Sequence, residues 1–200
     1  MNGIIKPAVV LFLVCLVVTC GLVLTYNLTK DIIDERTVLD AENARKEVLA
    51  GVDGFVKIEN IADIAESNPD NAALKLVREA YVGLKGEEEA GYVFSVVNKG
   101  YGGDINLIVG VDKSGKITGL KIIKHSETPG LGSKVTDKKF ISQLDGITPA
   151  GRLTVVKGQT EKPGEINAVS GATVSSRAVV GAVQAALDMA AELEKAADKQ

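Results

Sequence analysis

The chain has 200 residues, 46% of them hydrophobic, and a formal net charge of −3. This size and balance favour one globular domain plus a further segment. From Asn27 onward, 22 basic residues stand against 26 acidic ones, a net charge of −4, which argues against a nucleic-acid-binding surface.

The further segment is an apolar run at the start of the chain. No charged residue occurs between Pro7 and Tyr26. A helix of about 20 residues spans about 30 Å, the thickness of the hydrocarbon core of a membrane. A cleaved signal peptide would have a shorter core ending in a small-x-small site, whereas this run ends Leu24-Thr25-Tyr26-Asn27. We therefore predict an uncleaved transmembrane helix at residues 7–26.

The charges that flank the span predict its orientation. Lys6 and the terminal amine precede it, whereas Lys30 and Arg36 follow it among several acidic residues. Positive charge on a short stub favours its retention in the cytoplasm. Residues 1–6 are therefore predicted to be a cytoplasmic stub, with the rest of the chain on the extracytoplasmic side of the cell membrane.

The two cysteines, Cys15 and Cys20, both lie inside the predicted span. Five residues apart on a helix, they point in different directions and cannot form a disulfide with one another. Beyond the span the sequence has no cysteine and one histidine, His125. This argues against an iron–sulfur, haem or zinc site built from this domain alone.

Residues 27–50 predict a polar helix after the span, and Gly51-Val52-Asp53-Gly54 ends it. The segment could be a stalk, a packing surface for a neighbouring subunit, or the first helix of the domain. The sequence leaves these three open. We place the domain itself at residues 51–200.

Within the domain, three segments rich in β-branched residues predict strands, and Asp112-Lys113-Ser114-Gly115 predicts a hairpin loop between the last two. The fold class we expect is α+β, an antiparallel sheet flanked by helices, behind a single N-terminal transmembrane helix. The predicted strands are 92–97, 105–111, 117–123 and 153–157, and the predicted helices are 68–80, 140–144 and one that begins at Ser170.

The last helix is the most regular. Its apolar residues recur at steps of three and four: Val179, Val183, Leu187, Ala190 and Leu193. A helix that begins at Ser170-Gly171-Ala172-Thr173 presents free backbone N–H groups and the positive end of its dipole, which together can bind a phosphate. The simpler alternative is that Ser170 only caps the helix.

Three motifs together are more specific than any one of them. They are Gly100-Tyr101-Gly102-Gly103, Glu127-Thr128-Pro129-Gly130-Leu131-Gly132 and Ser170-Gly171-Ala172-Thr173. In this order they resemble the FMN-binding domain of membrane electron-transport complexes. The resemblance is greatest to the G subunits of Rnf-type ferredoxin:NAD oxidoreductases. The C subunits of sodium-translocating NADH:quinone reductases share the motifs.

The resemblance implies a covalent cofactor: FMN is attached through its phosphate to Thr173. Ser170, Gly171, Ala172 and Val174 would surround the attachment point. In the second motif Glu127, Thr128, Leu131 and Gly132 would line the flavin ring, with Leu131 on its face. The resemblance implies no catalytic side chain and no metal ligand in this chain.

The implied function is electron transfer within an ion-translocating complex in the cell membrane. The partners would be the other membrane subunits and a flavin transferase that attaches the FMN. This chain alone would not be a complete enzyme. Where many relatives carry an acidic residue three positions before the serine of the last motif, this sequence has Asn167. The alternatives are a quinone-reductase C subunit and a membrane-anchored anion-binding module without redox activity.

Overall fold

The computed structural model describes residues 2–148, 151–158 and 160–197. The chain divides into two compact units, with the boundary between Asp40 and Ala41. Helix α1 (Asn2–Val48) supplies the first unit and the first residues of the second.

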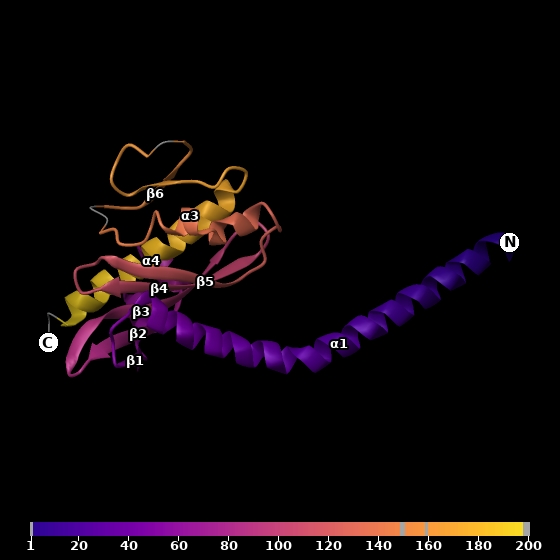
Figure 1. Ribbon diagram of the computed structural model, residues 1–200, viewed down its shortest axis with the longest axis horizontal. Coiled ribbons are helices and arrows are strands. Elements are labelled where there is room, and N and C mark those ends of the chain that lie inside the picture. Colours follow the sequence, from indigo (N-terminus) through magenta and orange to yellow (C-terminus); the bar gives the residue numbers. More distant parts are fainter. Residues whose placement is uncertain (1, 149–150, 159, 198–200) are drawn as a thin grey trace. The chain divides into compact units, whose positions relative to one another are not determined.

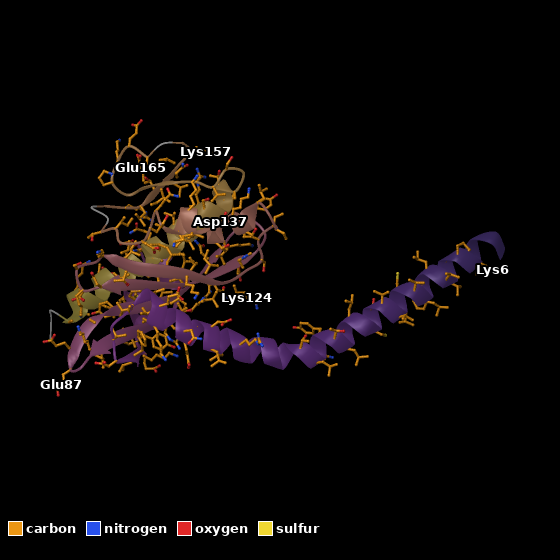
Figure 2. All side chains as sticks on the ribbon, viewed as in Figure 1. Lys6, Glu87, Lys124, Asp137, Lys157 and Glu165 are labelled. Carbon is orange, nitrogen blue, oxygen red and sulfur yellow. The ribbon has the colours of Figure 1, made fainter. Side chains whose placement is uncertain are left out.

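The first unit contains a candidate membrane span, Ile5–Lys30, with a mean hydropathy of 2.9. Its apolar side chains are exposed, and no residue of its apolar window is buried (Figure 2). The hydroxyls of Thr25 and Thr29 donate to the carbonyls of Gly21 and Thr25, each at 2.9 Å. Their polar groups are therefore satisfied within the helix, as a hydrocarbon environment requires. The predicted span 7–26 falls inside this segment, and within the described residues it is the one helix that could cross a membrane.

The second unit is built on a five-stranded antiparallel sheet in which each strand pairs with its neighbours in sequence (Figure 1). This confirms the predicted fold class of an antiparallel sheet with flanking helices. The strands are β1 (Gly54–Ile58), β2 (Val77–Lys85), β3 (Glu88–Lys99), β4 (Asp104–Asp112) and β5 (Ile117–His125).

The remaining elements lie before β2 or after β5. Strands β6 and β7 form a separate parallel pair, and α4 is the long C-terminal helix. The bounds are α2 (Ile61–Ser67), the 3₁₀ helices η1 (Ala72–Leu76) and η2 (Gly132–Thr136), α3 (Lys138–Ile141), β6 (Thr154–Val156), β7 (Glu165–Asn167) and α4 (Thr173–Ala197).

Each face of the sheet carries its own core. Because successive side chains in a strand point to opposite faces, Phe94 faces α4 and the main core, whereas Val93 faces a smaller cluster. Val179 and Val183, from the predicted apolar stripe of α4, are fully buried in the main core. The stripe thus fixes α4 along the sheet, with its N-terminus at the end that carries the β6 and β7 loops (Figure 1).

The helix predicted at 68–80 is wrong. Instead, a 3₁₀ turn leads into strand β2, whose residues pair with both β1 and β3. The apolar residues Leu74, Val77 and Tyr81 have helical spacing, but the hydrogen bonds that decide their structure come from strands elsewhere in the sequence. Strand β2 was therefore not predicted, and neither was β1 at Gly54–Ile58.

The other predicted elements are correct in type but differ in extent. The strands predicted at 92–97, 105–111 and 117–123 lie inside β3, β4 and β5. The short helix begins at Lys138 rather than 140, and α4 begins at Thr173 rather than Ser170. The strand predicted at 153–157 is β6, which pairs with the unpredicted β7 and not with the main sheet.

The end of α1 packs against the second face of the sheet. Ala44, Val48 and Leu49 are buried there against Val93 and Ile108. Of the three roles left open for 27–50, residues 41–49 therefore act as part of the domain. The hydroxyl of Thr118 in β5 donates to the carbonyl of Val48, which ties the helix end to the sheet. Opposite this carbonyl the sheet has a glycine, Gly110.

We expect Gly110→Ala to destabilise the domain by about 1–3 kcal/mol, the usual cost of overpacking. A Cβ at this position would lie 2.5 Å from both the Val48 carbonyl and the Thr118 hydroxyl. The matched control is Gly54→Ala in β1, where no atom lies within 4 Å of the added carbon. Thermal unfolding of the purified chain measures both. Equal melting temperatures for the two variants would show that the end of α1 does not pack closely against Gly110.

Candidate functional site

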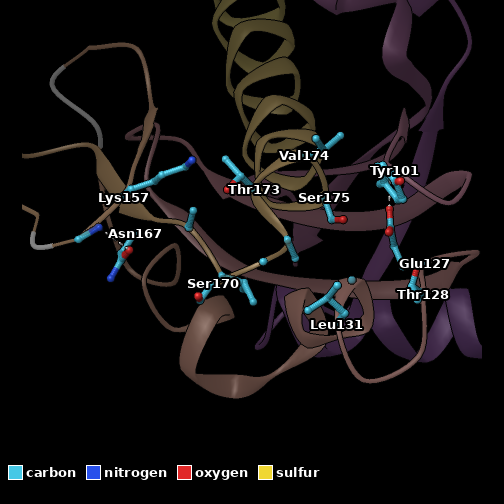
Figure 3. A pocket seen from close by; sticks show the side chains of 16 residues that line it. Tyr101, Glu127, Thr128, Leu131, Lys157, Asn167, Ser170, Thr173, Val174 and Ser175 are labelled. Carbon is cyan, nitrogen blue, oxygen red and sulfur yellow. Dashed lines mark hydrogen bonds between the residues drawn. The ribbon is translucent and has the colours of Figure 1, made fainter.

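The three sequence motifs come together around one cavity of about 790 Å³ (Figure 3). Its volume lies within the range of small-molecule and cofactor pockets. All nine residues named from the sequence line it: Glu127, Thr128, Leu131, Gly132, Ser170, Gly171, Ala172, Thr173 and Val174. The further lining residues are Tyr101, Lys157, Gly158, Asn167, Ala168, Val169 and Ser175. The cavity is at the opposite end of the domain from Glu87 in the β2–β3 turn (Figure 2).

The Ser170-Gly171 segment is a tight turn that leads into α4. The N–H of Ala172 donates to the carbonyl of Val169 at 2.9 Å, and Gly171 has a φ of +79°. A residue with a side chain would be strained at this φ, so glycine suits this position. The helix begins only after the turn, at Thr173. Ala172, not Ser170, therefore occupies the cap position, and the capping alternative for Ser170 is wrong.

The turn is held in place by Ser176, a buried residue one turn into α4. Its hydroxyl accepts from the N–H of Val169 at 3.0 Å and donates to the carbonyl of Ala172 at 2.9 Å. Both ends of the turn are thus fixed to the helix. The first N–H groups of α4, at Thr173, Val174 and Ser175, have no acceptor one turn earlier. These N–H groups lie at the end of α4 that lines the cavity, where an anion can accept hydrogen bonds from them.

Glu127 joins the other two motifs. The residue is only 5% exposed, and its carboxylate accepts from the N–H groups of Tyr101, at 2.8 Å, and Gly102, at 3.4 Å (Figure 3). A Cβ at Gly100 would lie 1.9 Å from one carboxylate oxygen, and a Cβ at Gly132 would lie 2.4 Å from the other. The two glycines therefore leave the space that this carboxylate occupies. Glu127 supports the wall of the cavity, and each of its carboxylate oxygens already accepts a hydrogen bond from the backbone.

The cavity lining combines apolar and polar groups. Leu131, Tyr101 and Val174 are 45%, 75% and 52% exposed. These are large apolar side chains left uncovered, which fits the face of a planar aromatic ring. The Thr173 hydroxyl and the Lys157 ammonium also line the cavity (Figure 3), beside the first N–H groups of α4. This combination fits a molecule that joins an aromatic ring to a phosphate, as FMN does.

Sequence reasoning missed several lining residues. Tyr101 belongs to one of the three motifs but was not named as a cofactor-binding residue, although an exposed aromatic residue between glycines is a usable signal. Lys157 and Asn167 enter the site because β6 pairs with β7, a pairing that no local pattern revealed.

Arg177, one turn into α4, is exposed and is not among the lining residues. His125 uses its Nδ1 to accept from the N–H of Glu127 at 3.3 Å.

Comparison with known proteins agrees with this geometry. The FMN-binding domain family matches residues 100–188, which include all three motifs. The chain is 34% identical to the G subunit of the Na(+)-translocating ferredoxin:NAD(+) oxidoreductase complex of Acetobacterium woodii, over 95% of this chain and 93% of that protein. It is 30% identical to the G subunit of the ion-translocating oxidoreductase complex of Aliivibrio fischeri, over 91% of this chain and 88% of that protein.

Among solved structures, the C subunit of the Na(+)-translocating NADH-quinone reductase of Parabacteroides distasonis is 18% identical. The match covers 79% of this chain and 94% of that one, with a TM-score of 0.48. The G subunits of Acetobacterium woodii and Aliivibrio fischeri both align along almost the whole chain. The chain therefore belongs to the family of G subunits of ion-translocating oxidoreductase complexes.

Proposed function

We propose that this chain is the electron-transfer subunit of a membrane-bound, ion-translocating ferredoxin:NAD oxidoreductase complex, with FMN joined through its phosphate to Thr173. The observation that carries the proposal is the placement of the Thr173 hydroxyl in the cavity that the three motifs enclose. Bound FMN would supply the redox chemistry. The protein supplies the attachment point, the contacts to the ring and the connection to the membrane.

The position of Thr173 suits a tether. As the first residue of α4 it lies beside the N–H groups that can donate to a phosphate, and its side chain is half-buried rather than packed in the core. An ester bond at this hydroxyl would leave the apolar side chains of the cavity to hold the ring. Retention of the cofactor would then not depend on the ring contacts, so the ring could remain near the surface for electron exchange.

Peptide mass spectrometry tests the attachment. The chain is purified from a host that contains a flavin transferase and is digested, and the peptide that ends at Arg177 is fragmented. We expect the mass of the flavin phosphate on Thr173. An unmodified peptide in a yellow protein would mean that the FMN is held without a covalent bond. An unmodified peptide in a colourless protein would instead favour the anchored anion-binding module.

We further propose that the domain lies outside the cytoplasm, with the stub before the span inside. Lys6 before the apolar segment supports this orientation. Protease added to intact spheroplasts should then digest the domain and leave the span. As a control, the same protease should not reach the domain in inverted vesicles. Digestion in inverted vesicles alone would reverse the orientation and place the site on the cytoplasmic side.

A further inference from the structure

Lys157 is a cavity-lining residue to which the sequence motifs assign no role. It follows strand β6 directly, and its side chain extends toward Thr173 (Figure 3). The cavity lining contains two residues that carry charge, Lys157 and Glu127. They lie on different sides of the cavity, Lys157 near Asn167 and Glu127 near Tyr101 (Figure 3). Lys157 is therefore the cation at the end of the cavity that contains Thr173.

The backbone on both sides of Lys157 is fixed. The side-chain oxygen of Asn167 accepts from the N–H of Gly158 at 3.3 Å, and the N–H of Ala168 donates to the carbonyl of Val156 at 2.8 Å. Asn167 is itself held by the amide of Gln143, which accepts from its N–H at 2.8 Å and donates to its carbonyl at 3.2 Å. Since Asn167 leads directly into the Ser170 turn, this network fixes the backbone on both sides of Lys157 relative to that turn, while the Lys157 side chain is exposed.

The Lys157 ammonium forms no ion pair with a described residue of the chain. Two acidic residues follow Lys157 before the end of β7, Glu161 and Glu165, and neither forms an ion pair among the described residues. An oxygen of Glu165 accepts from the N–H groups of Glu161 and Lys162 at 2.8 and 3.1 Å. Glu127 is occupied by the glycine-rich turn. An ammonium group held beside a cavity without a carboxylate to pair with favours an anionic ligand.

We propose that the Lys157 ammonium binds the phosphate of FMN at Thr173. The inference rests on the proposed function and adds to it the residue that recognises the phosphate. After attachment the phosphate is a diester with one negative charge, and the Lys157 cation compensates that charge at the mouth of the cavity. In a chain without attached flavin, the same contact would bind the phosphate of free FMN.

The test compares two flavins that differ only in the phosphate. The full chain is produced in a host without a flavin transferase, and its affinities for free FMN and for riboflavin are measured by fluorescence quenching. We expect Lys157→Met to weaken FMN binding about tenfold, the loss of one charge-assisted contact. Riboflavin binding should stay unchanged. Lys157→Arg should retain most of the preference for FMN.

The matched control is Lys162→Met, an exposed lysine in the same loop that is not among the cavity-lining residues. It should leave both affinities unchanged. An unaltered FMN preference in Lys157→Met would overturn the inference while the proposed function stands. A parallel loss of both flavins would also overturn it, because Lys157 would then only shape the loop. A chain that binds neither flavin would count against the flavin site itself, and so against both proposals.

Discussion

Replacement of Thr173 by alanine is expected to abolish the flavin that survives denaturation, while the domain keeps its fold. The change removes one hydroxyl and one methyl group from the first residue of α4, at the surface of the cavity. The turn before it remains tied to Ser176, and the buried stripe of α4 is untouched. The expected loss of stability is therefore below about 1 kcal/mol, compared with about 2–5 kcal/mol for a large core deletion.

Acid precipitation followed by flavin fluorescence in a denaturing gel measures the tether directly. Thr173→Ser is the matched control, because it keeps a hydroxyl at the same place and should retain part of the fluorescence. Ser170→Ala and Ser175→Ala remove the neighbouring hydroxyls of the cavity and should retain the signal. A fluorescent band of normal intensity in Thr173→Ala would place the attachment on another residue and refute the site assignment.

The parts of the fold that the sequence revealed are those with a local pattern. The apolar stripe of α4 and the strands β3 to β5 follow from spacing alone, because one face or both faces of each are buried. Strand β2 could not be recognised in the same way. Its Val77 and Ala80 pair with β3 and are buried in the main core, while their spacing also fits a helix.

In the candidate site, too, residues in continuous sequence motifs could be predicted, whereas residues brought in by distant contacts could not. The nine residues named from the motifs all line the cavity, since each motif is continuous in sequence. Lys157 and Asn167 lie outside the motifs and reach the site only through the β6–β7 pairing and the amide of Gln143. Contacts of this kind depend on residues far apart in sequence. The predicted helix start at Ser170 failed because a serine before a helix suggests a cap, whereas Ser176 supplies the hydrogen bonds here.

Replacement of Glu127 by alanine is expected to destabilise the domain by about 2–3 kcal/mol, the usual size for hydrogen bonds to a charged group. The carboxylate is the common acceptor for the N–H groups of Tyr101 and Gly102, and without it these donors lose their partner. The space left by Gly100 and Gly132 would then be empty. With its wall loosened, the cavity should hold the flavin ring less firmly, which changes the absorption spectrum while the flavin stays attached at Thr173.

Thr128→Ala provides the matched control, since Thr128 is the next residue, lines the same cavity and is exposed. It should change stability by less than about 0.5 kcal/mol. Glu127→Gln should fall between the two, because the amide keeps one acceptor oxygen but turns an N–H group toward one of the two backbone donors. Thermal unfolding gives the stabilities, and absorption spectra report the ring environment. If Glu127→Ala unfolds at the same temperature as Thr128→Ala, the carboxylate does not hold the two loops together, and the cavity wall must be stabilised by other contacts.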